Sequence, residues 1–370
     1  SANLAAALAQ QEGVGDFSRI DLQKALAGKA ASVSPSIRET SEGMSGRASP
    51  RDLETLFQLA WLYFTRPRRD ETAFEAFLSQ GRTALQNQSA SPQAAFRDTV
   101  LVTMANHHPR ARPVTAESLD EVDLDRALAF YRDRFASADD FTFLFVGALD
   151  PETMRPLVER YLAALPAVER DDAWVDLDID PPDGVVERIV RRGIEPRSQT
   201  LLAFTGPFDY TPENRLRMRI LGSVLETRLR ERLREDLGGT YSVGVSPGYE
   251  KVPEARYTLQ ITFGSDPDRA DELRAAVFDE VEKLKTEGPS AEDVASALEQ
   301  ERRARETDME SNGWWASQLR FSVETGSDPS FLVDDSREAA VTAEAVREDA
   351  GRYLDESRYV AVVLLPEDAG

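Results

Sequence analysis

The chain has 370 residues, 41% of them apolar, so it is long enough to bury a large core and to form two domains. It carries 44 basic against 66 acidic side chains, and the net charge of -22 disfavours binding to nucleic acid or to anionic membranes. Cysteine is absent, which excludes disulfides and thiolate chemistry, and no apolar run reaches the roughly 18 residues that a membrane-spanning helix needs.

The first half of the sequence predicts helices followed by a strand. Ser49 is suited to cap a helix, Pro50 fits its first turn, and apolar residues recur on one face over 53–64. Asp70 resembles the cap of a second helix, and the apolar segment 141–146 is typical of a strand.

The second half predicts strands at its beginning and at its end. Segments 186–191 and 200–205 are strand candidates that precede a helix over about 212–237. Segment 257–263 alternates strictly between apolar and polar residues, which predicts a strand with one buried face, and 360–365 predicts a last strand.

These elements recur in the same order at a nearly constant offset. Pro50 and Pro267 open matching helices 217 positions apart, and Phe143 and Val362 lie 219 apart in matching strands. The recurrence predicts an α+β fold of two homologous domains, each an antiparallel or mixed β-sheet packed against helices.

The acidic, proline-containing stretch between the repeats predicts a linker. We expect a first repeat over 1–168, a linker over 169–185 and a second repeat over 186–370. Subtracting the offset places the opening strands of the first repeat before residue 1. The first sheet is therefore expected to lack those strands and to expose an edge.

Most candidate chemical motifs fail on spacing. His107 and His108 are adjacent on a predicted loop, which does not give the helical spacing of a metal site. The glycine pair at 238–239 precedes a strand and not a helix, so it does not match a phosphate-binding loop. Trp314 and Trp315 fall in a predicted helix, where aromatic residues are more often core than a binding platform.

Arg234 and Tyr241 remain as candidates at the end of the long helix. A structural interpretation is available for both, since an arginine suits the negative end of a helix and a tyrosine suits a strand. The glycines between them would end the helix in a left-handed conformation.

The chain resembles the pitrilysin or insulinase-type (M16) zinc metallopeptidases along nearly its whole length, most closely the C-terminal half of bacterial periplasmic-type members. The resemblance rests on Glu-Gly-Met-Ser-Gly at 42–46, Thr-Arg-Pro-Arg at 65–68, Phe-Thr-Phe-Leu-Phe-Val-Gly at 141–147 and Tyr-Leu-Ala-Ala-Leu-Pro at 161–166. It also rests on Arg-Glu-x-x-Gly-x-x-Tyr, which spans Arg234 to Tyr241.

The resemblance implies that zinc is bound by an N-terminal half through a His-x-x-Glu-His motif, which this sequence lacks. This chain would then bind no cofactor, would be inactive alone, and would act with that half, in the same polypeptide or as a partner subunit, on a peptide substrate. Arg234 would contact the substrate and Tyr241 the developing oxyanion. The resemblance also implies a periplasmic location, while the sequence itself leaves a cytoplasmic one open.

Two alternatives stay open at this point. The chain could be a non-catalytic peptide-binding or scaffolding protein of the same fold, as some family members lack the metal site. It could also be an unrelated pair of α+β domains that captures peptides by adding a strand at the open sheet edge.

Overall fold

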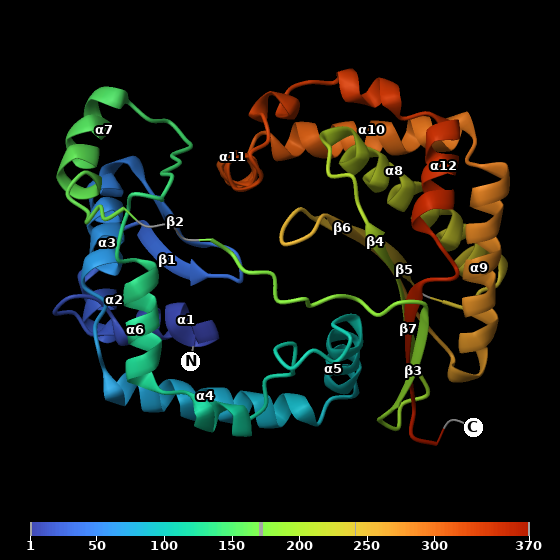
Figure 1. Cartoon of the computed structure of the whole chain (residues 1–370), viewed down its shortest axis with the longest axis horizontal. Helices are drawn as coiled ribbons and strands as arrows, with labels where there is room; N and C mark the ends of the chain where they lie inside the picture. Colours follow the sequence, from blue (N-terminus) through green and yellow to red (C-terminus); the bar gives the residue numbers. More distant parts are fainter. Residues whose placement is uncertain (1, 170–172, 241, 369–370) are drawn as a thin grey trace. The chain divides into compact units, whose positions relative to one another are not determined.

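The computed structural model describes residues 2–169, 173–240 and 242–368, and its elements fall into two compact units. The first unit comprises Ser1–Asn87 and Val114–Val175, and the second comprises Gln88–Pro113 and Asp176–Gly370 (Figure 1). Both contain helices packed against β-sheet, which confirms the predicted α+β class.

The first unit contains most of the N-terminal elements. They are η1 (Ala2–Leu4), α1 (Ala5–Glu12), α2 (Arg19–Ala25), β1 (Ala31–Ile37), β2 (Glu42–Ala48), η2 (Pro50–Asp52), α3 (Leu53–Thr65), α4 (Glu71–Ser89, which extends into the second unit), η3 (Glu117–Glu121), α6 (Leu124–Arg134), α7 (Pro151–Leu157) and the π-helix η4 (Val158–Leu162).

The second unit contains α5 and all elements after the stretch between the repeats. They are α5 (Pro92–Met104), β3 (Val185–Arg191), β4 (Ser198–Pro207), α8 (Pro212–Leu229), the π-helix η5 (Arg230–Asp236), β5 (Val243–Glu250), β6 (Arg256–Ser265), η6 (Pro267–Arg269), α9 (Ala270–Glu287), α10 (Ala291–Asp308), α11 (Asn312–Thr325), η7 (Pro329–Leu332), η8 (Ser336–Ala340), α12 (Ala343–Tyr353) and β7 (Tyr359–Leu365). Within the described part of the chain, no helix is long and apolar enough to cross a bilayer.

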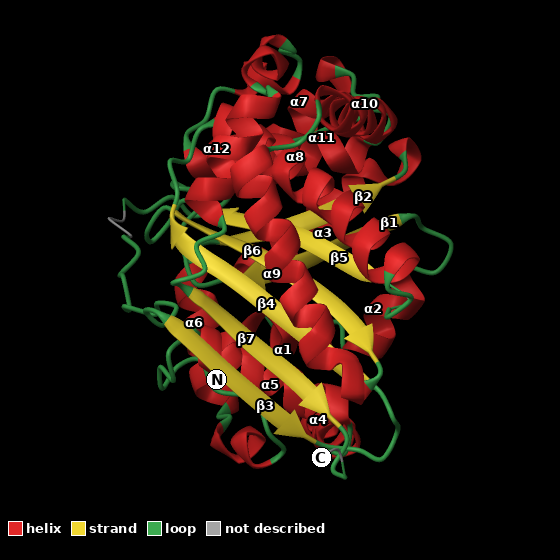
Figure 2. Cartoon of the chain, turned by 90° about the vertical axis from the view of Figure 1, so that its right-hand side faces the viewer, coloured by secondary structure: helices red, strands yellow, loops and turns green. Residues whose placement is uncertain are grey.

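The second unit is built on one five-stranded mixed sheet. Its strand order is β3-β7-β4-β6-β5, in which β3 runs parallel to β7 and every other neighbouring pair is antiparallel. β4 is central and pairs along its length with β6 on one side and with β7 on the other. Figure 2 shows the strands with α9 crossing the face toward the viewer.

Helices cover both faces of this sheet. The larger buried cluster joins α8, α9 and α12 to one face through residues at helical spacing, including Leu221, Leu225, Val277 and Val281. The other face carries α5, whose Phe96 packs with Leu201, Ala203, Val360, Val362 and Leu364. Both faces of β4 and β7 are therefore buried, which explains their nearly continuous apolar sequences.

The first unit has only a two-stranded sheet among its described residues. β1 and β2 form an antiparallel hairpin in which Ala31 pairs with Ala48 and Ile37 with Glu42. Behind it, α1, α3 and α6 enclose a core that includes Leu8, Phe64 and Tyr131. The Tyr131 hydroxyl donates to the Tyr63 carbonyl at 3.1 Å, so this buried phenol is satisfied.

The prediction of a strand over 141–146 was wrong for this chain. The segment pairs with no other strand among the described residues and belongs to no sheet. It is nevertheless held against α3, because Phe141 and Phe145 pack on Phe64 and Phe57 with ring centroids 4.9 and 5.4 Å apart. A strand needs a neighbour for its backbone hydrogen bonds, and packing on a helix does not supply one.

The internal repeat is visible in the elements themselves. η2 and η6 lie 217 positions apart, and α6 and α12 have equal lengths 219 positions apart. The match between segment 141–146 and β7 is shifted by one residue from the predicted offset. The phenylalanines of this segment face α3, and the helix equivalent to α3 in the second repeat is α9. They must therefore match the residues of β7 that face α9.

Phe141 therefore corresponds to Tyr359, which packs on Phe278 of α9 at 5.1 Å, and the offset here is 218 rather than 219. A slip of one residue would place these side chains on the opposite face of the sheet.

The boundary between the two packed units differs from the boundary between the two sequence repeats. Segment Gln88–Pro113 belongs to the first repeat by sequence but packs in the second unit. The boundaries at 168 and 186 describe sequence equivalence and stay a prediction.

Candidate functional site

The end of the long helix that carries Arg234 is fixed by several backbone contacts. α8 continues into the π-helix η5, where the amide of Leu237 donates to the Arg232 carbonyl at 3.2 Å. Gly238 then takes a φ of 58°, which ends the helix in the left-handed conformation that glycine allows. The guanidinium of Arg269 donates to the Leu237 carbonyl at 3.2 Å and so satisfies an exposed helix end.

The next two residues are held by packing and by a turn. A Cβ at Gly239 would lie 2.6 Å from a methyl group of Leu273, so only glycine allows this approach to α9. Thr240 is buried, and its hydroxyl donates to the Ser242 carbonyl at 2.8 Å. The chain is therefore fixed immediately before and after position 241.

Arg234 is exposed on η5, and it forms no hydrogen bond or ion pair with another residue that the structure describes. Its neighbours on the same helix differ, since Arg230 pairs with Glu226 at 2.7 Å and Arg232 with Asp236 at 3.6 Å. Tyr241 lies outside the described residues, so the pairing of Arg234 with Tyr241 stays a prediction. Single turns of π-helix occur frequently at functional sites, and Arg234 lies on one.

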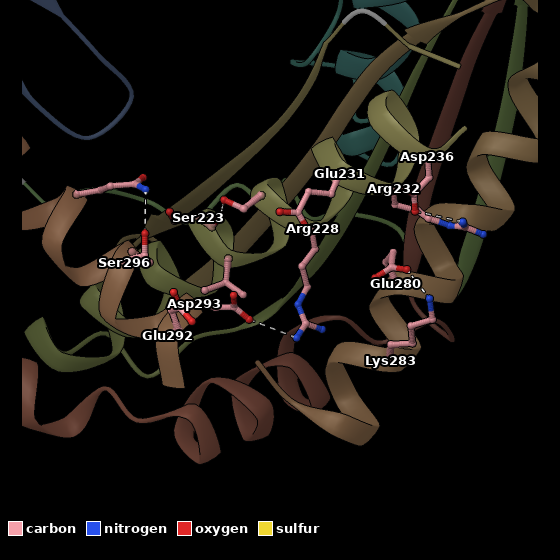
Figure 3. Close-up of a pocket in the computed structure, with 14 residues that line it drawn as sticks. Ser223, Arg228, Glu231, Arg232, Asp236, Glu280, Lys283, Glu292, Asp293 and Ser296 are labelled. Atoms are coloured by element: carbon pink, nitrogen blue, oxygen red, sulfur yellow. Dashed lines mark hydrogen bonds and ion pairs between the residues drawn. The ribbon is translucent and has the colours of Figure 1, made fainter. Parts of the chain in front are cut away.

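A polar pocket of about 530 Å³ lies beside this helix in the second unit (Figure 3). It is formed by α8 with η5, by α9 and by α10, and its polar lining residues are Ser223, Thr227, Arg228, Glu231, Arg232, Asp236, Glu280, Lys283, Glu292, Asp293, Ser296 and Gln300. Neither Arg234 nor a histidine lines it. The pocket therefore contains serines without an imidazole base to activate them.

The cations of this pocket are matched inside it. Lys283 lies 2.6 Å from Glu280, and Arg228 lies 3.6 Å from Asp293 and donates to the Gly288 carbonyl at 2.8 Å. The Lys283 pair lies within α9, whereas the Arg228 contacts tie α8 to α10 and to the residue that follows α9. Arg232, the third cation of the lining, pairs with Asp236 at 3.6 Å, so each cation of this pocket has a carboxylate partner.

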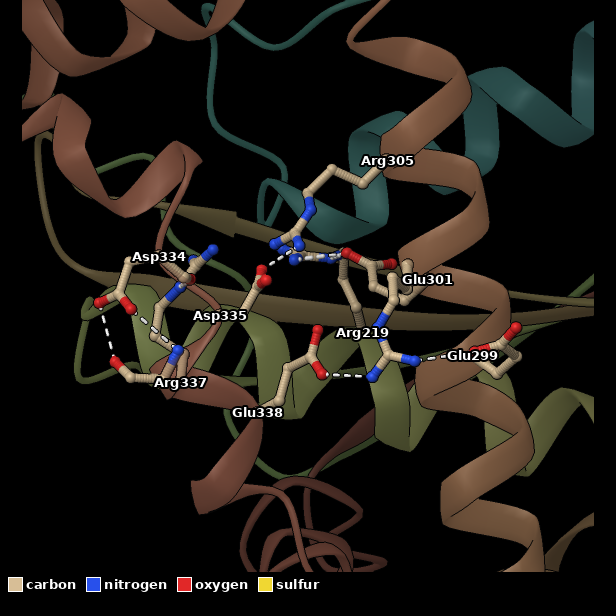
Figure 4. Close-up of polar contacts among 10 residues, drawn as sticks. Arg219, Glu299, Glu301, Arg305, Asp334, Asp335, Arg337 and Glu338 are labelled. Carbon is tan, nitrogen blue, oxygen red and sulfur yellow. Dashed lines mark hydrogen bonds and ion pairs between the residues drawn. The ribbon is translucent and has the colours of Figure 1, made fainter.

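A second charged cluster fixes the segment after α11 (Figure 4). Arg302 of α10 pairs with Glu338 of η8 at 2.7 Å, and Arg305 of the same helix pairs with Asp335. Arg219 pairs with Glu301 at 2.7 Å. Each arginine in these pairs has a carboxylate partner, so we interpret the cluster as structural.

The histidine pair and the tryptophan pair singled out in the sequence form no site with catalytic or metal-binding groups among the described residues. His107 lies in a turn with a φ of 59°, and the ring of His108 accepts a bond from the Arg110 amide at 3.3 Å. Trp314 and Trp315 are half-buried in α11, and the Trp315 indole donates to the Met309 carbonyl at 2.8 Å. Neither tryptophan joins a buried cluster of the described residues, so the core interpretation was too strong.

The described residues do not fit a zinc ion. Across 2–169, 173–240 and 242–368, no three His, Asp or Glu side chains form a group that could hold a metal. Zinc sites use three or four such ligands. No step of a reaction is therefore assigned to a metal in this chain.

Sequence reasoning missed an unusual carboxyl group in the first unit. Glu12 ends α1, is fully buried, and neither of its carboxylate oxygens has a hydrogen-bond partner in the structure. Burial, and then the nearby Asp70 carboxylate, raise the pKa of Glu12 to about 7, against smaller opposing effects of Arg69, of the Asp70 backbone and of Arg132. Nothing in the polar run Gln-Gln-Glu at 10–12 indicates this burial.

The comparisons with known proteins agree with one another. The family model described as the peptidase M16 inactive domain matches residues 121–301. A zinc protease PQQL-like protein of Arabidopsis thaliana is 26% identical over 348 residues, which cover 85% of this chain and 36% of that protein. The chain thus spans about a third of the length of the curated relatives it matches.

Solved structures show the same fold. The periplasmic protease PqqL from Escherichia coli superposes with a TM-score of 0.85 at 21% identity, over 99% of this chain and 40% of that one. The first half of the same protease superposes with a TM-score of 0.75 at 12% identity, over 98% of this chain and 82% of that one. Together with the family model and the curated relatives, these likenesses support an assignment of the chain to the M16 peptidase family.

Proposed function

We propose that this chain is the substrate-binding, C-terminal half of an M16-type zinc metalloendopeptidase, and that it acts with a separate half that holds the zinc ion. The proposal rests above all on Arg234, an exposed guanidinium without a partner among the described residues, which lies on a helix end whose backbone is fixed. An arginine held in this way suits a fixed acceptor such as a peptide carbonyl or carboxylate, because its planar fork loses little freedom on binding.

Tyr241 is the second proposed contact. Its described neighbours Gly239, Thr240 and Ser242 are held by packing and hydrogen bonds. A phenol donates one hydrogen bond and would stabilise negative charge on the carbonyl oxygen of a peptide under attack.

Two observations support the assignment to a C-terminal half. Whole PqqL matches better than its first half alone, both in TM-score and in identity, so the better match lies in the remainder of that protein. The matching family model also describes an inactive domain. We propose a periplasmic location on the same ground, since the E. coli protease is described as periplasmic.

The experiment combines the chain with an M16 half that contains a His-x-x-Glu-His motif and measures cleavage of a quenched fluorescent peptide. We expect cleavage only in the mixture. Tyr241→Phe should lower kcat about 10- to 1000-fold, because it removes one oxyanion donor. Arg234→Ala should lower kcat/KM, and Arg234→Lys should restore only part of the loss because lysine lacks the planar fork.

Arg230→Ala is the matched control, since Arg230 lies on the same π-helix but is paired with Glu226. It should leave kcat/KM within about twofold of the unmodified mixture, as an exposed ion pair contributes little. Equal losses in Arg230→Ala and Arg234→Ala would show a general loss of helix structure and would count against the assigned role of Arg234.

A non-catalytic peptide-binding or scaffolding role is the second candidate. It is favoured by the absence of a metal-binding group among the described side chains and by the description of the family model. A mixture that binds a labelled peptide but never cleaves it, with a catalytic half shown to be active with another partner, would support this role over the first.

A further inference from the structure

Two arginines of the second unit are buried without an ion pair. Arg215 lies in the first turn of α8 and Arg337 lies in η8, and only 6% and 9% of these residues are exposed. No carboxylate of the described residues forms an ion pair with either guanidinium group, and the Nε atom of Arg215 has no hydrogen-bond partner. Buried charges in proteins are normally paired, because removing an ion from water is costly.

Aromatic rings surround the two cations. The ring centroid of Phe331 lies 5.0 Å from the Cζ atom of Arg215 and 5.2 Å from that of Arg337. Three more rings face Arg215 at 4.4, 5.3 and 6.0 Å, those of Phe321, Tyr210 and Tyr249. The hydroxyl of Tyr210 is also a hydrogen-bond acceptor for Arg215. Rings and hydroxyls attract a cation, but as neutral groups they do not cancel its charge.

Further guanidinium groups lie nearby and make this region more positive. Burial lowers the pKa of Arg215. Burial also lowers the pKa of Arg337, and the guanidinium groups of Arg219, Arg305 and Arg215 lower it further. Arginine nevertheless stays protonated in proteins, so both buried positive charges persist.

The carboxylates of this region are already engaged. Those of the charged cluster in Figure 4 pair with arginines other than these two. Asp334 attracts Arg337, but its carboxylate oxygens accept bonds from the amide and the hydroxyl of Ser336, each at 2.8 Å. The Nε atom of Arg337 donates to the Asp334 carbonyl at 3.3 Å. The described part of the chain therefore supplies no counter-ion in contact with Arg215 or Arg337.

We propose that Arg215 and Arg337 bind a single carboxylate or phosphate group between α8 and the η7–η8 segment (329–340). The planar fork of a guanidinium group matches the oxygens of both kinds of anion. The Tyr249 hydroxyl accepts a bond from Arg219 at 3.1 Å and donates to no described acceptor, so its proton is available to the ligand. Because so little of either arginine is exposed, one oxyanion group fits this site better than an extended polyanion.

The ligand would connect two parts of the unit that are distant in sequence. Arg215 belongs to α8, whereas Phe331 and Arg337 belong to the η7–η8 segment. In that segment the amides of Val333 and Glu338 donate to local carbonyls at 3.2 and 3.0 Å. A bound anion should hold the segment against α8 and slow the local opening that exposes these amides. This inference does not depend on the proposed function.

The test is hydrogen–deuterium exchange of the whole chain during three titrations. The probes are sodium phosphate, the tripeptide Gly-Glu-Gly with both termini blocked, and sodium chloride at equal ionic strength. We expect amides of 329–340 to exchange more slowly as a probe oxyanion saturates the site, about tenfold at ten times its dissociation constant. Chloride and a blocked Gly-Gln-Gly peptide should have no such effect, because neither carries an oxyanion.

Substitutions show whether the two arginines hold the anion. Arg337→Gln should abolish the protection, since it removes one of the two charges. Arg215→Met should do the same while keeping an unbranched side chain among the rings, and Arg337→Gln decides alone should Arg215→Met not fold. Arg320→Gln is the matched control, because Arg320 precedes Phe321 on α11, is half exposed and pairs with Glu324 at 3.7 Å. It should keep the full response.

The probes also distinguish the sources of the anion. Protection by phosphate alone would identify a small free anion as the ligand, and protection by the glutamate peptide alone would identify a carboxylate of a polypeptide. Either result supports the site. No saturable protection by any probe would overturn it. Protection that is equal in Arg337→Gln and in the unmodified chain would show a general effect of salt on stability and would also overturn it.

Discussion

Glu12 gives the first unit a stability that should fall as pH rises. Its carboxyl group is fully buried without a hydrogen-bond partner, and its pKa is raised to about 7 from an ordinary 4.5, mainly by burial. Folding therefore favours the protonated form. The neutral acid is accommodated at low pH, whereas the charged form must be buried at high pH.

The magnitude follows from the interval between the two pKa values. The unfolded chain loses this proton around pH 4.5 and the folded chain around pH 7. At about 1.4 kcal/mol for each pH unit, the free energy of unfolding should decrease by about 3 kcal/mol across that range and then level off. The other charged groups that face Glu12 are Asp70, Arg69 and Arg132, and the Asp70 carboxylate adds to the effect.

Glu12→Gln is the decisive substitution, because an amide of the same shape stays neutral at every pH. We expect it to match the wild type at pH 4 and to be more stable by up to about 3 kcal/mol at pH 8. The assay is a urea titration at each pH in which a short hydrogen-exchange pulse reports the unfolded fraction of α1 and α3.

Asp70→Asn tests the smaller contribution. Asp70 accepts a bond from the Ala73 amide at 3.1 Å and caps α4, a role that asparagine keeps. Removing its charge should lower the pKa of Glu12 and so reduce the pH dependence without abolishing it. If Glu12→Gln kept the pH profile of the wild type, the carboxyl group would not be the source and the argument would be refuted.

Three further substitutions test the second unit. Arg217 donates two hydrogen bonds of 2.7 and 2.8 Å to the Asp349 carboxylate, and burial raises the pKa of that carboxyl group. Arg217→Met should lower the free energy of unfolding by about 3 kcal/mol because it leaves a buried charge unpaired. Adding Asp349→Leu should recover much of this loss, as a urea titration would show. Gly238→Ala should lower stability by about 1 kcal/mol because of its positive φ, and Gly238→Asn by less, both measured by urea titration. Ser290→Ala removes the capping box of α10 and should cost about 1 kcal/mol, with a lower thermal midpoint as the readout.

Periodicity predicted the architecture well where the chain supplied both partners of a contact. The helix that begins at Ser49-Pro50 and the strands around 200–205 and 257–263 are present, because their apolar spacing matches faces that the chain itself buries. The segment 141–146 has an equally strong strand pattern but remains unpaired. Its apolar side chains are typical of a strand, but the pattern of one segment does not reveal whether another strand lies beside it.

The site was less predictable than the fold. The family resemblance singled out Arg234, and the structure adds that the residue is exposed and has no hydrogen-bond or ion-pair partner among the described residues; the role of Tyr241 is still a prediction. Glu12 escaped notice because its burial depends on the loops and helices packed around it, and not on its neighbours in sequence. Long-range contacts of this kind leave no periodic signal.

The packing of α5 has a consequence for how the protein is made. This helix is synthesised before any strand of the sheet that it covers. Phe96 therefore has no packing partners until Leu201 and Val362 have been synthesised. A shorter polypeptide that started at residue 186 would lay bare the apolar back of that sheet and would be prone to aggregate. The two repeats are therefore not independent folding units, because α5 belongs to the first repeat by sequence and covers one face of the sheet of the second.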